Sequence, residues 1–386
     1  MTSARQWAAT IALAVGIFIL ITIEELPIGV LSVMAPDLGV SEGVAGLAVT
    51  VPGVLAGVVA IFTPVIAGSL DRRLVLVLAL ASVVVSCVLS VIAPTFAVLL
   101  LARLFAGVSI GLYWAVLAIV AVAQMPPHRA PRALTIAFSG AGAALVLGVP
   151  VASWIGTHLG WRTAFAVVGC AALLVAVLIA AVVAPVRTST PVSMRMMGRA
   201  AAHRGVRHAL VLTALMITAQ FITYSYVSPL LHSRAGVPLT SIGGMLLLFG
   251  VAGMIGNFAV GAVLRRSAPL GVLVIAAGLA LAILVLLLVV RSLASAFVVM
   301  PLWGLFAGAA SVTVQAFVSS EGREVVEEGT ALNSAVFNVS IALGALIGGR
   351  ILDLAGQEAL MIASVVLLAV ALVVVARYLR TTPTHV

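Results

Sequence analysis

The sequence contains no lysine and few charged residues of either sign. Its 386 residues include 20 basic and 11 acidic side chains, so charged residues make up 8% of the chain while hydrophobic residues make up 63%. Every basic residue is an arginine, so the net charge of +9 cannot be lowered by deprotonating an ammonium group or by lysine acetylation. A soluble core of this size needs far less apolar surface. The composition therefore predicts a polytopic membrane protein.

The chain is also poor in the residues that hold metals or form disulfides. Its two cysteines, Cys87 and Cys170, both fall inside apolar runs, which argues against a disulfide framework or a zinc site. The histidines lie at loops or at the ends of apolar runs, and their spacing is not that of metal ligands. We therefore expect no metal, no cofactor and no enzymatic activity, because no nucleophile with its base is apparent.

Long apolar runs fill most of the chain. A helix needs about 20 apolar residues to cross a bilayer, and twelve runs reach roughly that length. The first is far longer than the core of a signal peptide, so we expect it to remain in the protein. The expected spans lie near residues 8–34, 43–69, 74–93, 96–123, 132–157, 163–184, 208–231, 241–264, 269–290, 293–319, 330–354 and 358–379.

The arginines between these spans indicate the orientation. An even number of spans places both termini on one side, and cytoplasmic loops are enriched in positive charge. The loops on the side of the termini hold fifteen arginines: Arg5, Arg72, Arg73, Arg129, Arg132, Arg187, Arg195, Arg199, Arg204, Arg207, Arg265, Arg266, Arg323, Arg377 and Arg380. The opposite side holds Arg162, Arg234, Arg291 and Arg350. The sequence thus predicts a multi-pass protein of the cell (inner or plasma) membrane with cytoplasmic termini. Because the arginines occupy short loops, nucleic-acid binding is not expected.

The two halves of the chain resemble each other weakly. LFAG occurs at 104–107 and again at 305–308, and the double arginine at 72–73 returns at 265–266, which gives offsets between 193 and 201 residues. Parallel repeats of this kind imply two six-helix bundles with a pathway between them. We expect bundles at 1–184 and 208–386, joined by an arginine-rich cytoplasmic linker at 185–207.

Polar side chains inside the spans concentrate in spans one, four, seven, ten and eleven, and we expect spans one, four, seven and ten to line a central cavity. Glu24 and Glu25 are the only ionisable groups of span one, and Arg103 lies in span four. Such residues are costly in a bilayer and usually mark a pathway. Two adjacent carboxyls should titrate as a pair. We therefore expect Glu24, Glu25 and Arg103 to serve proton coupling, beside a substrate cavity lined by Tyr113, Trp114, Gln220, Tyr224, Tyr226, Trp303, Gln315 and Asn338.

Small residues repeat every four positions along spans two, five, eight and eleven. Span five shows this best, with Gly140, Ala144, Gly148, Ala152 and Gly156 on one face. Such faces let helix backbones approach closely. We expect them to pack the two halves against each other, either as ordinary helix packing or as part of a gate.

These motifs resemble the major facilitator superfamily, specifically its twelve-span drug:proton antiporters and the related sugar and nucleoside exporters. TIEELPIGVL at 22–31 is similar to the group's T-T-E-F-x-x-x-G-L-L, which places the family glutamate on Glu24 and leaves Glu25 where an aromatic residue is usual. Arg103, Gly107 and Gly111 match R-x-x-x-G-x-x-x-G, whose arginine is implicated in proton coupling.

The resemblance assigns two further motifs. Gly148, Pro150 and Gly156 in span five are similar to the antiporter motif. Asp71, Arg72 and Arg73 keep only the core of the family's gating loop, G-x-x-x-D-R-x-G-R-R, because Leu74 follows at once. The resemblance implies the major facilitator fold for the whole chain and transport by alternating access.

The leading hypothesis is proton-coupled efflux of small amphipathic molecules, such as antimicrobials, with the substrate, protons and the lipid bilayer as partners and a monomer as the expected state. Glu24 would carry the proton, unless it is a fixed, permanently protonated hydrogen-bond donor. Glu25 would recognise cationic substrates or pair with a neighbouring helix. The alternatives are a sugar or nucleoside exporter of the same fold and, more remotely, a non-transporting receptor or scaffold.

Overall fold

The computed structural model of the protein describes residues 4–67, 70–187 and 194–381. Over these ranges the chain is helical without β-strands, and eleven helices are long and apolar enough to cross a membrane. The last of them, α16 (Val326–Thr381), is interrupted at Gly356, whose φ of 79° lies in the left-handed region that glycine tolerates. Because α16 therefore supplies two spans, the twelve expected spans are present.

The first half of the chain forms a six-helix bundle. Its second span begins with the short helix α2, and its fifth span consists of three segments because a π-helical turn, η2, precedes Pro150. Proline cannot donate a backbone hydrogen bond, and such turns often accommodate that loss. The helices are α1 (Ala4–Asp37), α2 (Glu42–Ala45), α3 (Leu47–Ala67), α4 (Arg72–Ile92), α5 (Phe96–Ala123), α6 (Ala130–Ala143), η2 (Ala144–Gly148), α7 (Val149–Leu159) and α8 (Trp161–Val182).

The second half repeats this arrangement. Its first span is divided into α10 and α11 near Tyr226, and its second into α12 and the short helix α13. The helix α9 (Met194–Ala202) lies within the segment that joins the halves. The remaining helices are α10 (Arg204–Tyr224), α11 (Val227–Ala235), α12 (Ile242–Ala259), α13 (Gly261–Leu264), α14 (Ala268–Val289), α15 (Leu293–Glu321) and α16.

Backbone geometry supports the internal repeat. Four glycines in the described chain have positive φ, and they form two pairs: Gly39 with Gly236, and Gly160 with Gly356. The members of each pair are 197 and 196 residues apart, within the range of offsets that the sequence repeats have. Each pair ends corresponding spans, because the left-handed conformation stops a helix there. The halves therefore share turns as well as helices.

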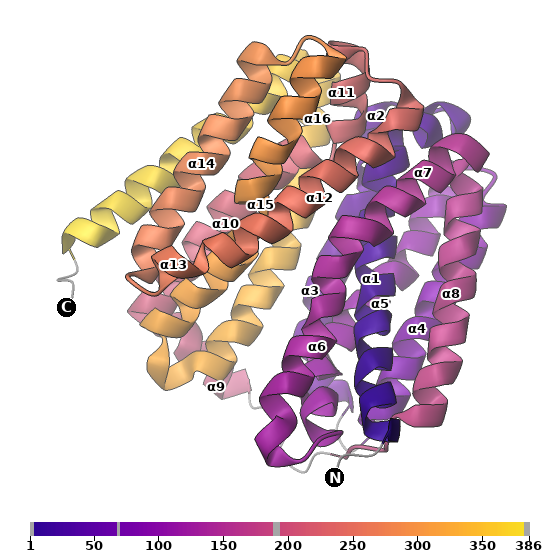
Figure 1. Cartoon of the computed structure of the whole chain (residues 1–386), viewed down its shortest axis with the longest axis vertical. Coiled ribbons are helices and arrows are strands. Elements are labelled where there is room, and N and C mark those ends of the chain that lie inside the picture. The colour runs from indigo at the N-terminus through magenta and orange to yellow at the C-terminus, as the bar shows by residue number, and fades with distance from the viewer. Residues whose placement is uncertain (1–3, 68–69, 188–193, 382–386) are drawn as a thin grey trace.

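The two halves meet at the end of the molecule opposite the N-terminus and α9. In Figure 1, α2, α7 and α11 lie at one end, which we call the far face, and the N-terminus and α9 lie at the other, the terminal face. Helix α3 packs against α16, and α12 packs against α7 and η2. Toward the terminal face, in contrast, the halves diverge, and Figure 1 shows α6 of the first half well apart from α13 of the second. The far face is the closed end.

The small-residue faces of spans five and eleven lie inside their own bundles, so the expectation that these two faces join the halves is wrong. A Cβ at Gly140, Gly148 or Gly156 would clash with α1 of the same half, and one at Gly344 or Gly348 would clash with α10. Close approach is needed there because helices within a bundle stay in contact along their lengths. The contacts between halves use other glycines: Gly53 and Gly57 of α3 against α16, and Gly243 and Gly250 of α12 against α7 and η2.

Candidate functional site

Two adjacent carboxyl groups lie in the interior of α1. Glu24 is 5% exposed and Glu25 is 6% exposed. Glu24 Oε1 and Glu25 Oε2 are both buried and make no hydrogen bond. Buried polar groups are normally hydrogen-bonded, and exceptions often mark functional positions. In a membrane protein, unsatisfied carboxyls of this kind mark ion or substrate pathways.

The two carboxyls have charged or polar neighbours in different halves of the molecule. Successive residues on a helix are about 100° apart, so neighbouring side chains diverge. Glu24 is within electrostatic range of Arg103 on α5, in the first half. Glu25 is within electrostatic range of the Tyr224 hydroxyl on α10, in the second half. The pair therefore lies where the bundles meet and is sensitive to both.

Arg103 contacts the backbones of α1 and α3 and not the carboxyl groups of α1. The side chain is fully buried, and it donates from Nη1 to Ile23 O at 2.9 Å, from Nη2 to Glu24 O at 3.2 Å and from Nε to Ala48 O at 2.8 Å. None of the ion pairs in the described part of the chain involves Arg103. The charge of Glu24 is thus left without a direct partner in this conformation.

An aromatic cluster occupies the second half beside Glu25. Tyr224 stacks on Phe249 with ring centroids 4.9 Å apart, and both rings meet Trp303 edge-on, at 5.9 and 5.3 Å. Trp303 Nε1 donates to Gln220 Oε1 at 2.9 Å, and Phe221 meets Tyr224 edge-on. These rings, with the Gln220 amide at their edge and the Glu25 carboxyl within electrostatic range of Tyr224, form an apolar surface that has a few polar points, which is the usual character of a small-molecule site. The sequence predicts Gln220, Tyr224 and Trp303 here but not Phe221 or Phe249, since phenylalanines on apolar helices carry no distinguishing signal.

Two of the tyrosines predicted to line the cavity lie apart from this cluster. Tyr113 is fully buried beside Gly16, and its hydroxyl donates to Leu13 O at 2.9 Å, which ties α5 to α1. Tyr226 lies at the far face, where its hydroxyl donates to Ala345 O and reaches Gly43 O of the other half at 3.5 Å. Both tyrosines make contacts between helices.

The remaining predicted cavity residues are dispersed. Trp114 packs against Phe138 with ring centroids 5.8 Å apart. Gln315 joins an amide network in the second half, in which it accepts a hydrogen bond from Asn333 Nδ2 at 3.0 Å. Asn338 donates to Ser334 O of its own helix at 2.9 Å. The structure thus brings together the carboxyls, Gln220, Tyr224 and Trp303, and leaves the others elsewhere.

Comparison with known proteins decides the family. The sequence model of the Major Facilitator Superfamily matches residues 13–326. The chain belongs to this superfamily. It is 32% identical over 378 residues to "Transcription regulatory protein OpdE" of Pseudomonas aeruginosa, with 95% of this chain and 92% of that protein covered. It is 29% identical to "Purine ribonucleoside efflux pump NepI" of Salmonella enteritidis, with 98% of this chain and 95% of the relative covered.

Solved structures agree on the fold. A bacterial homologue of the human lysosomal transporter Spinster, solved in an inward-facing and occupied conformation, superposes with a TM-score of 0.77 at 16% identity and covers 99% of this chain and 98% of its own. The protein is therefore a major facilitator transporter of small molecules, embedded in a membrane, and not an enzyme.

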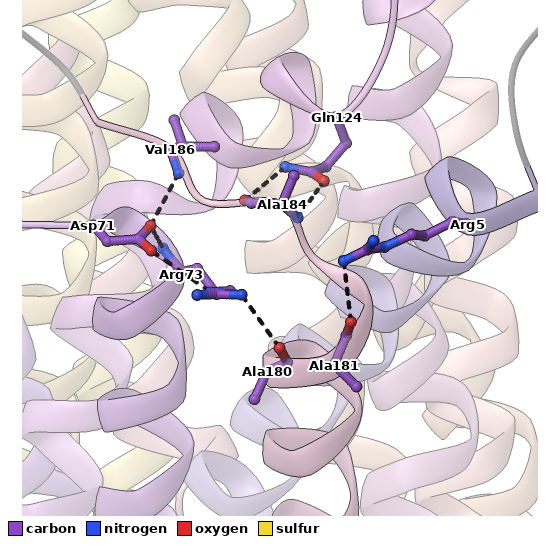
Figure 2. A network of polar contacts seen from close by, with 8 residues as sticks. All are labelled: Arg5, Asp71, Arg73, Gln124, Ala180, Ala181, Ala184 and Val186. Atoms are coloured by element: carbon purple, nitrogen blue, oxygen red, sulfur yellow. Dashed lines mark hydrogen bonds and ion pairs between the residues drawn. The ribbon is translucent and has the colours of Figure 1, made fainter.

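The loop motif of this major facilitator protein fastens helices of one half together. Asp71 caps α4 by accepting from Arg73 N, and it also accepts from Val186 N at 2.9 Å, beyond the end of α8. Figure 2 shows Arg73 and Arg5 reaching toward the last turn of α8, where Arg73 donates to Ala180 O at 3.4 Å. Positive side chains at a helix C-terminus complement its dipole. Arg72 contributes its backbone, since Arg72 N donates to Val186 O at 2.8 Å.

The antiporter-motif residues lie between the carboxyl-bearing helix and the other half. Gly148 and Gly156 face α1, where added Cβ atoms would clash with Thr22 and Val30. Pro150 presents its carbonyl to Gly243 of α12. Movement of the fifth span is thereby coupled sterically both to α1 and to the second half.

Far-face contacts were not predicted from the sequence. Asp353 of α16 accepts from Ser41 Oγ at 2.7 Å and from Gly43 N at 3.1 Å, so it crosses from one half to the other. Ser228 of α11 donates to Ser32 of α1 at 3.2 Å. The only available signal was the position of these polar residues at span ends, which does not identify partners 196 or 312 residues away.

Proposed function

We propose that this protein is a proton-coupled exporter that moves small, partly apolar molecules out of the cell by alternating access, with Glu24 as the proton carrier. The observation that supports this most is the pair of buried, unsatisfied carboxyls between Arg103 in one half and an aromatic cluster in the other. A group at that position interacts differently with each half as the halves move. Its protonation can therefore bias which face is open.

The arginine distribution supports the orientation. Loops on the terminal face carry most of the arginines, which favours a cytoplasmic location for that face. The closed far face would then face outward, so the described conformation is accessible from the cytoplasm. Cargo enters from that side, and Glu24 releases its proton there.

The exchange follows from competition for one site. A proton that binds Glu24 when the far face is open returns the protein to the cytoplasm-accessible conformation. Loss of that proton to the cytoplasm leaves a carboxylate that favours cargo binding and the opposite conformation. The proton favours the return to the cytoplasm-accessible conformation, and cargo favours the change to the opposite one. Each cycle therefore exports cargo and imports a proton.

The aromatic cluster supports a flat cargo with hydrogen-bonding groups. Rings of Tyr224, Phe249 and Trp303 offer faces and edges for stacking, while Gln220 and Glu25 offer polar contacts. Purine ribonucleosides have these properties, and the NepI relatives are named as efflux pumps for them. Within the class of small amphipathic molecules, purine ribonucleosides are therefore the first cargo to test, followed by antimicrobials and sugars.

A second candidate comes from the relative named as a transcription regulatory protein. In that case the fold would sense a small molecule. Binding at the same aromatic cluster would change the arrangement of the two halves without net transport. Binding without flux distinguishes this function from export.

The test is uptake by proteoliposomes that hold the purified protein, with an imposed pH gradient and a panel of purine ribonucleosides, cationic and neutral antimicrobials, and sugars. We expect at least one purine ribonucleoside to accumulate against its gradient when the pH gradient is present and not when it is collapsed. Accumulation of no compound in the panel, with binding retained, would replace export by the regulatory function.

A further inference from the structure

Among the helical prolines of the first half, Pro27 and Pro52 leave backbone carbonyls without their helical donors close to Arg103. In an α-helix the carbonyl of residue i accepts from the N–H of residue i+4. Pro27 of α1 and Pro52 of α3 have no N–H, so Ile23 O and Ala48 O lose their partners. Inside a membrane an unsatisfied backbone group costs several kcal/mol, so a donor from a neighbouring helix is needed.

Arg103 bonds to these same two carbonyls. Its Nη1 donates to Ile23 O at 2.9 Å and its Nε donates to Ala48 O at 2.8 Å. A guanidinium suits this task because it holds several donors in one rigid plane and can serve two acceptors at once. One buried side chain thus supplies the donors that both prolines remove.

The glycine that follows Arg103 by one helical turn brings α5 close enough. A Cβ at Gly107 would lie 2.7 Å from Pro52 O and 2.9 Å from Pro52 Cα. Any larger residue would push α5 away from α3 and lengthen the bond from Arg103 to Ala48. The arginine and the glycine therefore act together on the helix that contains Pro52.

The second half has no arginine at the position equivalent to Arg103 and no proline at the positions equivalent to Pro27 and Pro52. LFAG at 305–308 aligns Gly304 with Arg103, so α15 has no arginine at this position. The counterpart of α3, α12, contains no proline, and the one proline of α10 and α11, Pro229, aligns with Ser32 and not with Pro27 at the Gly39–Gly236 offset. Where the backbone donors are present, the arginine is absent, which is the pattern expected if the arginine replaces them.

We propose that Arg103 is a positioning residue that supplies the two backbone donors missing at Pro27 and Pro52, and so joins α1, α3 and α5 beside Glu24 in the far-face-closed conformation. Its role in coupling rests on the proposed function. The titratable groups near the guanidinium are Glu24 of α1 and Cys87 of α4, and α3 contributes none. Once Glu24 has released its proton, its carboxylate competes with Ile23 O and Ala48 O for the guanidinium. The bonds to the carbonyls then open, and α1 and α3 are free to bend at their prolines.

The test asks whether restoring the backbone donors makes Arg103 dispensable. Two proteins are compared: one carries Arg103→Met alone, and the other carries Arg103→Met together with Pro27→Ala and Pro52→Ala. Both are full-length and also carry Cys87→Ala and Cys170→Ala, which removes the native cysteines. Spin labels at His128→Cys and Ala262→Cys, both exposed and near the terminal face, report the distance between halves. The readouts are this distance distribution and the melting temperature, neither of which requires transport.

We expect Arg103→Met to broaden the distance distribution and lower the melting temperature, and the two proline substitutions to reverse both changes. The matched control is Pro301→Ala, which alters an internal proline of α15 whose orphaned carbonyl, Phe297 O, accepts no bond from Arg103. Proton-coupled transport should stay lost in Arg103→Met with the two proline substitutions, because the guanidinium that interacts with Glu24 is missing. If transport proves uncoupled even in wild type, only the proposed function fails.

The proposal would be overturned if Arg103→Met combined with Pro27→Ala and Pro52→Ala had the same distance distribution and melting temperature as Arg103→Met combined with Pro301→Ala. Arg103→Lys provides a second comparison, and the only one needed if Arg103→Met does not insert. It keeps the charge, but a single ammonium cannot reproduce the fork that spans both carbonyls. A wild-type distance distribution in Arg103→Lys would assign the effect to charge and contradict the proposal.

Discussion

Glu24 and Glu25 have the same chemistry and are neighbours in sequence, yet they lie in different environments. Glu24 is near a guanidinium of its own half, whereas Glu25 is near the rings of the other half. A residue near the arginine suits proton coupling, because the guanidinium interacts differently with its charged and its neutral form. A residue at the edge of aromatic rings suits cargo recognition. The side chains are thus expected to differ in which step of transport they affect.

The Glu25→Gln variant separates these roles. It keeps the size of the side chain but removes its charge and replaces one acceptor oxygen with an NH2 donor, so cargo that donates hydrogen bonds should bind less well while proton loading at Glu24 continues. We expect a raised KM for cargo with an unchanged ratio of protons to cargo, measured in the same proteoliposomes. A changed ratio with unchanged KM would assign Glu25 to the proton path instead.

Between elements, the two halves use ion pairs of opposite polarity at equivalent places. In the first half Arg162, at the start of α8, pairs with Asp37 at the end of α1 and donates to Ala93 O after α4. In the second half Arg234, at the end of α11, pairs with Glu358 and donates to Leu287 O of α14. The arginine is on the sixth span in the first half and on the first span of the second half, but both ion pairs join the first and last spans of their half. The repeat therefore preserves contacts more strictly than residue types.

Burial predicts which of these arginines matters more for stability. The Arg162 side chain is 38% exposed, and such pairs contribute about 0–1 kcal/mol. The Arg234 side chain is 9% exposed, and loss of a buried hydrogen-bonded partner costs about 1–3 kcal/mol. Arg234→Gln should therefore lower the melting temperature in detergent more than Arg162→Gln does. The reverse order would show that far-face stability depends on the first half.

Element-level features were only partly accessible from the sequence. Spans could be found from apolar length, because a bilayer imposes that length on any helix. The small-residue faces were also visible, but which neighbour they meet depends on how helices rotate, and Gly148 turned out to face α1. Arg103 could be singled out by its cost in a membrane, whereas its bonds to Ile23 and Ala48 required the positions of three helices.

At the scale of the whole molecule, the halves are closed at the far face and separate toward the terminal face. Asp353 joins Ser41 and Gly43 across the closed end, and Tyr226 reaches the same segment. These contacts involve few side chains, so they can be exchanged for others when the halves rotate. The carboxyls of α1 lie between this closed end and the terminal face, beside helices of both halves. A charge change there acts on the arrangement of the entire molecule.

The most direct test of proton coupling measures protons that move when cargo moves. A pH-sensitive dye inside proteoliposomes reports proton flux after a gradient of the transported compound is imposed, in wild type, in Glu24→Gln and in the exposed control variant Glu324→Gln. Wild type and Glu324→Gln should move protons opposite to the cargo, and Glu24→Gln should move none while it still binds cargo. Proton flux in Glu24→Gln equal to that of wild type would contradict the assignment of Glu24 as the proton carrier.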